Sequence, residues 1–132
     1  YLRDKKLDVI NMSLGLTTNY KEIEDLCNEF ISKGVTIVCS YPKKGNSFVF
    51  PAFYDGVVKV TSEWMCKDEK VVTLNKDILL FGANPFSNVK SVAGSSVAVA
   101  KFTKEFCSYL KKGLKKDEIL DEFFKRIIDE SK

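Results

Sequence analysis

Hydrophobic positions along the chain follow two patterns, short unbroken runs and longer stretches with a helical period. The run Val35-Thr36-Ile37-Val38-Cys39 is almost continuously apolar, as expected for a strand that is buried on both faces. Similar runs predict strands at 8–14, 35–40, 57–61, 70–74 and 78–81. The polar stretch at 67–70 favours a hairpin turn between the third and fourth of these strands.

Apolar residues three and four positions apart predict helices at 19–33, 95–112 and 116–129. Asn19 is expected to be the N-cap of the first helix, and Gly34 follows its end. The buried faces of the first and last helices are predicted to consist of Ile23, Leu26, Cys27, Phe30, Ile31, Ile119, Leu120, Phe123, Phe124 and Ile127. Together these elements predict an α/β fold, a mainly parallel sheet flanked by helices.

The composition is that of a globular domain. The chain has 132 residues, of which 45% are hydrophobic and 30% charged, so we predict one core and one domain across 1–132. The formal net charge is +3, but the lysines are scattered and form no basic stripe, which argues against a nucleic-acid partner. No apolar run resembles a membrane span or a signal sequence, so no membrane partner is expected.

The cysteines lack the close spacing that is typical of a metal site. Cys27, Cys39, Cys66 and Cys107 include no Cys-x-x-Cys pair, and the chain has no histidine to complete a zinc set. A thiol on an apolar face acts as a small hydrophobic group, so we interpret them as reduced core residues, which favours a reducing compartment such as the cytoplasm. Glycine-rich nucleotide loops are absent as well, and no metal or other cofactor is predicted.

The segment Gly94-Ser95-Ser96-Val97-Ala98 carries the candidate chemistry, because it places a serine hydroxyl where the 95–112 helix begins. Backbone N–H groups at a helix start are unpaired and the helix dipole favours negative charge, so an attacking serine would lie close to donors for an oxyanion. The alternative is that the serines form an ordinary N-cap. A serine nucleophile also needs a base, normally a histidine oriented by a carboxylate, and this chain has no histidine.

Five blocks of the sequence resemble, in the same order, segments of the subtilisin-like serine peptidases (subtilases). Asp8-Val9-Ile10-Asn11-Met12-Ser13-Leu14-Gly15 resembles the family's Val-Ile-Asn-Met-Ser-Leu-Gly strand, and the block 94–98 resembles its nucleophile motif Gly-Thr-Ser-Met-Ala. The other blocks are 34–40, Phe50-Pro51-Ala52-Phe53-Tyr54 with the strand after it, and 77–83. The resemblance implies a cis Phe50–Pro51 bond and a single partial domain, the C-terminal half of the peptidase domain.

The same resemblance implies the site residues. Ser96 is the nucleophile, and the oxyanion donor falls on Lys43 without a gap or on Asn46 with a three-residue insertion. A plain turn is the alternative for Asn46. An extended peptide would add to strand edges formed by Ser13, Leu14, Gly15, Ser40 and Tyr41. Tyr41 replaces a small residue of the family, so it either narrows the primary pocket or packs under the loop.

The function that the resemblance implies is a serine endopeptidase, which cleaves peptide or protein substrates through an acyl-enzyme on Ser96. The family's Asp and His lie before the first block, so an N-terminal segment or a second chain would supply them, and we expect this chain alone to be inactive. The alternative is a catalytically inactive subtilase-like module that binds a peptide or a partner protein. It is favoured by the altered Gly-Asn region at Gly45-Asn46, by Tyr41, and by Val99-Ala100-Lys101, which stands where the family has a residue followed by Pro-His. A third possibility is a structural fragment with no separate activity.

Overall fold

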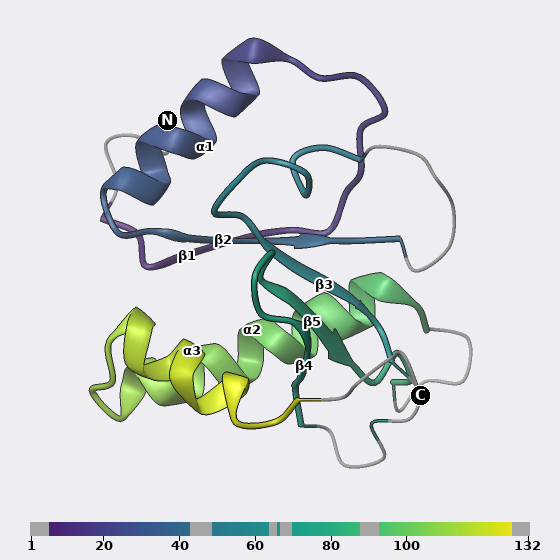
Figure 1. Ribbon diagram of the computed structural model, residues 1–132, viewed down its shortest axis with the longest axis vertical. Coiled ribbons are helices and arrows are strands. Elements are labelled where there is room, and N and C mark those ends of the chain that lie inside the picture. Colours follow the sequence, from purple (N-terminus) through teal and green to yellow (C-terminus); the bar gives the residue numbers. More distant parts are fainter. Residues whose placement is uncertain (1–5, 43–48, 64–65, 67–69, 88–92, 128–132) are drawn as a thin grey trace.

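The computed structural model describes residues 6–42, 49–63, 66, 70–87 and 93–127. These residues form five strands and three helices in the predicted order (Figure 1). The elements are β1 (Val9–Met12), α1 (Lys21–Ser32), β2 (Thr36–Ser40), β3 (Val58–Ser62), β4 (Val72–Asn75), β5 (Leu80–Ala83), α2 (Ser95–Lys111) and α3 (Lys116–Phe124). The predicted α/β fold is confirmed.

The sheet is parallel except at one edge. Its strand order is β1-β2-β3-β5-β4, with β4 antiparallel to β5 and the other neighbours parallel. The register pairs Val9 with Thr36 and Val60 with Phe81. Both sides of β3 are therefore occupied, by β2 and β5, and the predicted hairpin between the third and fourth strands is wrong. The hairpin joins β4 to β5, through a turn that ends at Leu79 with a φ of 54°.

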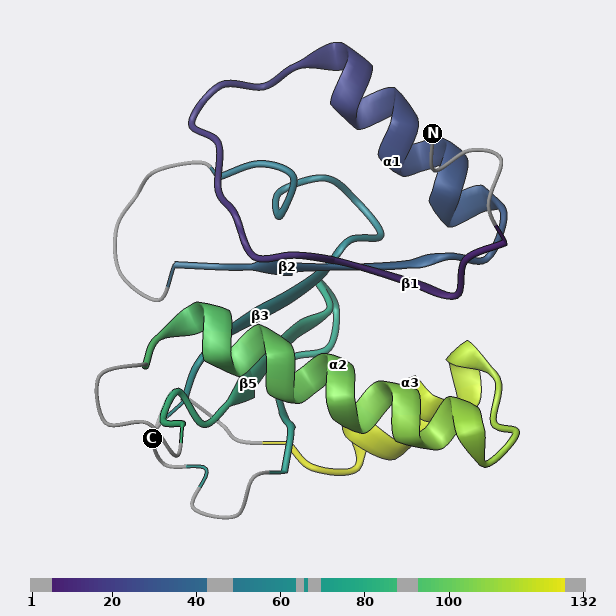
Figure 2. The same ribbon diagram turned by 180° about the vertical axis from the view of Figure 1, so that it is seen from behind.

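Helices cover both faces of the sheet, α1 on one face and α2 with α3 on the other (Figures 1 and 2). Alternate residues of β2 pack on opposite faces of the sheet. Ile37 packs in the layer between the sheet and α1, and Val38 in the layer between the sheet and α2. The α2 layer contains a cluster of aromatic rings: the ring of Phe81 lies 5.2 Å from that of Phe102 and 5.9 Å from that of Phe123, centroid to centroid. The continuous apolar runs are explained by burial on both faces.

Helix α1 has Tyr20 as its N-cap, so the prediction of Asn19 is wrong. The carbonyl oxygen of Tyr20 accepts the N–H groups of Ile23 and Glu24 at 3.0 and 3.1 Å. The Oδ1 atom of Asn19 accepts a hydrogen bond of 2.7 Å from the Tyr54 hydroxyl. Asn19 therefore holds the segment before β3 and does not cap the helix.

Helix α3 ends at Phe124, well before the predicted end at 129. The reason is a competing partner in β4, because Thr73 donates its N–H to the Arg126 carbonyl at 2.6 Å and its hydroxyl to the Phe123 carbonyl at 2.7 Å. Ile127, predicted on the buried face of the helix, is 64% exposed. Pairing with the edge of the sheet replaces the last turns of the helix.

Gly82 in β5 marks a close approach between neighbouring strands. A Cβ atom at Gly82 would lie 2.7 Å from the Cβ atom of Glu63, which follows β3, and neither atom can move without its backbone. We therefore expect Gly82→Ala to lower the free energy of unfolding by about 1–3 kcal/mol. Urea denaturation measures the change. An unaltered unfolding midpoint would contradict the close approach.

Candidate active site

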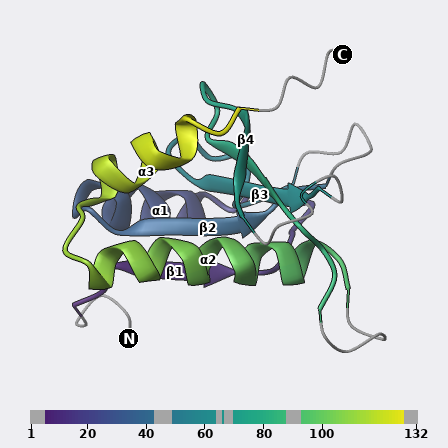
Figure 3. The ribbon, with the colours of Figure 1, turned by 90° about the horizontal axis from the view of Figure 1, so that it is seen from below.

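The carboxyl ends of β1 and β2 lie on the same side of the molecule as the first turn of α2 (Figure 3). A hydrogen bond of 3.1 Å from Asn11 Nδ2 to Thr103 Oγ1 ties the end of β1 to the middle of α2. The segments predicted to hold the nucleophile and the substrate lie at the ends of these elements: 13–15 comes after β1, Ser40 ends β2 and Tyr41 follows it, and 95–96 begins α2. The fold therefore brings all three segments to the side of the sheet where β1 and β2 end.

Ser96 is the second residue of α2 and is exposed. The N-cap is Gly94, whose φ of 124° is one that glycine adopts readily, and its carbonyl oxygen accepts the N–H groups of Val97 and Ala98 at 3.1 Å each. Since glycine has no side chain, the helix begins without a side-chain cap, and neither serine is the N-cap. The N–H groups of the first turn and the helix dipole thus lie next to the Ser96 hydroxyl.

Lys101 of α2 forms hydrogen bonds to the segment 84–86, which precedes the helix. Its ammonium donates to the Phe86 carbonyl oxygen and, at 3.3 Å, to Asn84 Oδ1. The side-chain amide of Asn84 in turn donates to the Cys66 carbonyl at 2.8 Å. In the sequence, Lys101 stands out only as a departure from the family's Pro-His, and these contacts were not predicted, because a lysine on an amphipathic helix gives no signal that distinguishes it from a solvated one.

The hydroxyl of Ser96 has no histidine in this chain that could act as its base. The chain contains no histidine, and Ser96 forms no side-chain hydrogen bond within the described ranges. An alcohol without a proton acceptor is a weak nucleophile. The described residues therefore offer an accessible hydroxyl and helix-start N–H donors, and they include no histidine that would activate the hydroxyl.

The segment after β1 is open on its outer side. Ser13, Leu14 and Gly15 are exposed, Leu14 to 44%, and Ser13 Oγ donates to Asn11 Oδ1 at 3.3 Å. Val49 packs closely on Gly15, since a Cβ atom added at Gly15 would lie 2.6 Å from Val49 Cγ1. Beyond it, Leu16 and Phe50 exchange two backbone hydrogen bonds of 2.8 Å and close the base of the loop.

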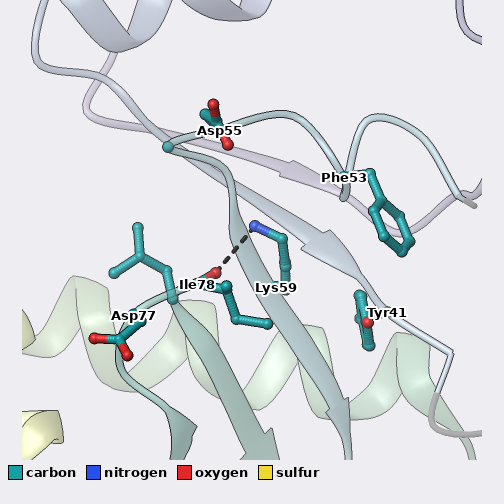
Figure 4. Close-up of a pocket in the computed structure, with 8 residues that line it drawn as sticks. Tyr41, Phe53, Asp55, Lys59, Asp77 and Ile78 are labelled. Carbon is teal, nitrogen blue, oxygen red and sulfur yellow. Dashed lines mark hydrogen bonds between the residues drawn. The ribbon is translucent and has the colours of Figure 1, made fainter.

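The end of β2 turns toward the α1 layer. Ser40 is half-buried and pairs with Val60, whose carbonyl oxygen accepts the Tyr41 N–H at 2.9 Å. The Tyr41 ring packs on the ring of Phe53, with centroids 5.6 Å apart, and faces a cavity that contains Lys59 (Figure 4). The observed ring contact of Tyr41 is with Phe53, and both alternatives for Tyr41, narrowing of the primary pocket and packing under the loop, stay predictions.

The two candidates for the oxyanion donor, Lys43 and Asn46, lie outside the described residues, and that assignment stays a prediction. The Phe50–Pro51 bond is cis, as predicted.

All four cysteines are free thiols. Burial raises the pKa of Cys39 to about 12, which makes this thiol a poor nucleophile.

Neither a metal site nor a membrane helix is visible in the part of the chain that the structure describes. No three His, Cys, Asp or Glu side chains in that part are grouped as metal ligands would be. Each of its helices is too short or too polar to cross a bilayer.

Comparison with known proteins gives a partial similarity. No family model matches the chain. Over 59 residues, 43% of its length, the chain is 36% identical to Minor extracellular protease Epr of Bacillus subtilis (strain 168). The chain covers 9% of that protein. The sequence is thus similar, over less than half its length, to a small part of a much longer protease.

Proposed function

We propose that this chain is the nucleophile-bearing part of a subtilisin-like serine endopeptidase in which Ser96 attacks the peptide bond. The observation that carries the proposal is the position of Ser96. It is exposed in the first turn of α2, on the side of the sheet where the parallel strands end. In open α/β sheets, ligands bind outside the carboxyl ends of the strands. The subtilase-like blocks and the partial similarity to a protease support the same function.

In the proposed reaction, Ser96 Oγ attacks the carbonyl carbon of the scissile bond while a histidine takes its proton. Transfer of that proton to the leaving nitrogen breaks the C–N bond and leaves an ester on Ser96, which water hydrolyses by the same steps. N–H groups of the first turn of α2 would stabilise the oxyanion, together with the predicted side-chain donor, Asn46 or Lys43. Losing one such donor costs about 10²–10³ in rate.

The histidine and its aspartate would come from an N-terminal segment or from a second chain, because this chain has no histidine. The outer edge of β1 suits that segment. The strand order leaves β1 at the edge of the sheet, and its run Val9-Ile10-Asn11-Met12 contains no proline or charge that would hinder pairing. One end of a strand paired with β1 would lie at the carboxyl end of β1, on the side of the molecule where α2 begins (Figure 3).

The alternative, an inactive subtilase-like module that binds a peptide or a partner protein, is favoured by two contacts. Val49 packs on Gly15 and reduces the room beside the predicted substrate segment. Lys101 stands at the position of the family's histidine after the nucleophile, and its ammonium is committed to Asn84 and Phe86. Neither contact covers the Ser96 hydroxyl.

Hydrolysis of a quenched fluorescent peptide library separates the two functions. We expect no turnover by the chain alone, and turnover at least about 10⁶-fold above the uncatalysed rate by the polypeptide that also contains the Asp- and His-bearing segment. Polarisation of the same peptides, unquenched, measures binding. Binding without cleavage by the longer polypeptide would contradict the peptidase and establish the alternative.

A further inference from the structure

A second candidate site lies on the opposite face of the sheet from α2. It is a cavity of about 180 Å³ whose walls come from the end of β2, the turn before β3, β3 itself and the turn between β4 and β5 (Figure 4). At about 30 Å³ of liquid volume per water molecule, it has room for a ligand of the size of one amino acid. Ser96 is not part of this cavity, and Tyr41 is the one residue of its wall that also belongs to the predicted substrate segments.

The floor of the cavity is a buried lysine. Lys59 is 7% exposed, and its Nζ donates to the carbonyl oxygens of Val57 at 2.9 Å and of Ile78 at 3.0 Å. An ammonium carries three donors, and no acceptor for the third is found among the described residues. Burial lowers the pKa of Lys59, and the charge of Asp55 opposes that shift. A buried ammonium with an unused donor favours an anionic acceptor.

The walls beside this ammonium are apolar and open to solvent. The rings of Tyr41 and Phe53 lie 5.6 Å apart, and Phe53 and Ile78 are 36% and 43% exposed. An apolar ligand side chain between Phe53 and Ile78 would remove their exposed surface from water and contact the aromatic rings. The cavity therefore suits a ligand that combines a carboxylate with an apolar group.

One carboxylate at the rim is placed to act on the ligand as well. Asp55 is exposed, forms no hydrogen bond or ion pair within the described residues, and is the carboxylate whose charge acts on Lys59. The carboxylate of Asp77, by contrast, points away from the ammonium (Figure 4). The mouth of the cavity thus adds a site for a positive charge close to the site for a negative one.

We propose that this cavity binds a free α-amino acid with an apolar side chain. The ligand carboxylate accepts the third N–H of Lys59, and the ligand ammonium lies beside Asp55. The ligand side chain packs between Phe53 and Ile78. A zwitterion with an apolar side chain matches the cation, the anion and the apolar walls together, and a simple anion or cation matches only part of them.

Titration of the isotope-labelled chain with three related probes, followed by NMR chemical shifts, tests the proposal. L-phenylalanine should give saturable shifts at Tyr41, Phe53 and Lys59. L-phenylalaninamide lacks the carboxylate and should bind about tenfold more weakly or worse. 3-Phenylpropionate lacks the ammonium and should bind several-fold more weakly. Because these arms use the unaltered chain, equal binding of the acid and the amide, or no saturable shift with L-phenylalanine, would overturn the proposal.

Two variants assign the charges. Lys59→Met keeps the length of the side chain and should remove the difference between L-phenylalanine and its amide. Asp55→Asn should remove the difference between L-phenylalanine and 3-phenylpropionate. Asp77→Asn is the matched control at the same rim and should leave all three affinities unchanged. Loss of binding in Asp77→Asn with retention in Asp55→Asn would contradict the assignment.

Discussion

Replacing Ser96 by alanine is expected to lower kcat for peptide hydrolysis on the order of 10⁶-fold in the polypeptide that also contains the Asp- and His-bearing segment. The substitution removes the oxygen that forms the acyl-enzyme, so neither the histidine nor the oxyanion donors can act on a covalent intermediate. Because Ser96 is exposed, the variant should fold as the parent does. Initial rates with a cleaved library peptide measure the effect.

Ser95→Ala is the matched control for this experiment, because Ser95 is the neighbouring serine of the same first turn. Ser95 stands at the family's threonine position and takes no covalent part in the proposed reaction, so we expect its loss to change kcat by less than about tenfold. A loss at Ser95 as large as at Ser96, or full activity of Ser96→Ala, would refute the assignment of the nucleophile.

The largest effect on stability is expected from Phe81→Ala, at about 3–5 kcal/mol. Phe81 is fully buried, and its ring contacts the rings of Phe102, Phe123 and Phe124 between the sheet and its two covering helices. Truncation leaves a cavity that several rigid rings cannot fill together. Since domains are stable by only about 5–15 kcal/mol, the variant should be largely unfolded in moderate urea.

Phe86→Ala provides the comparison for Phe81, because Phe86 is 56% exposed. We expect a change in the free energy of unfolding within about 0.5 kcal/mol, measured by the same urea titration. Equal losses at the two positions would mean that the aromatic core between the sheet, α2 and α3 does not exist as described.

The elements that local patterns govern could be predicted from the sequence, and their ends could not wherever a distant residue decides them. The run at 35–40 was enough to predict a doubly buried strand, since its side chains serve both layers. The start of α1 was misassigned because Asn19 bonds to Tyr54, 35 residues away. The end of α3 was misassigned because Thr73 donates hydrogen bonds to the carbonyl oxygens of Phe123 and Arg126.

The same difference between local and distant determinants applies to the two candidate sites. The position of Ser96 at the start of α2 could be predicted, because a motif and a helix start coincide in a few consecutive residues. The cavity around Lys59 could not be predicted, because its walls come from three separate stretches of the chain, at Tyr41, 53–59 and 77–79. A signal was present in the sequence: Lys59 interrupts the apolar run Val57-Val58-Lys59-Val60, and a charge inside a doubly buried strand requires partners. Which partners it finds depends on the turn between β4 and β5.

Mass-spectrometric mapping of fluorophosphonate labelling tests the central claim, that Ser96 is a nucleophile whose base lies outside this chain. We predict labelling of Ser96 in the polypeptide that also contains the Asp- and His-bearing segment, and none in the 132-residue chain alone under the same conditions. Rapid labelling of Ser96 in the chain alone would contradict the missing base. An unlabelled Ser96 in the longer polypeptide would contradict its role as the nucleophile.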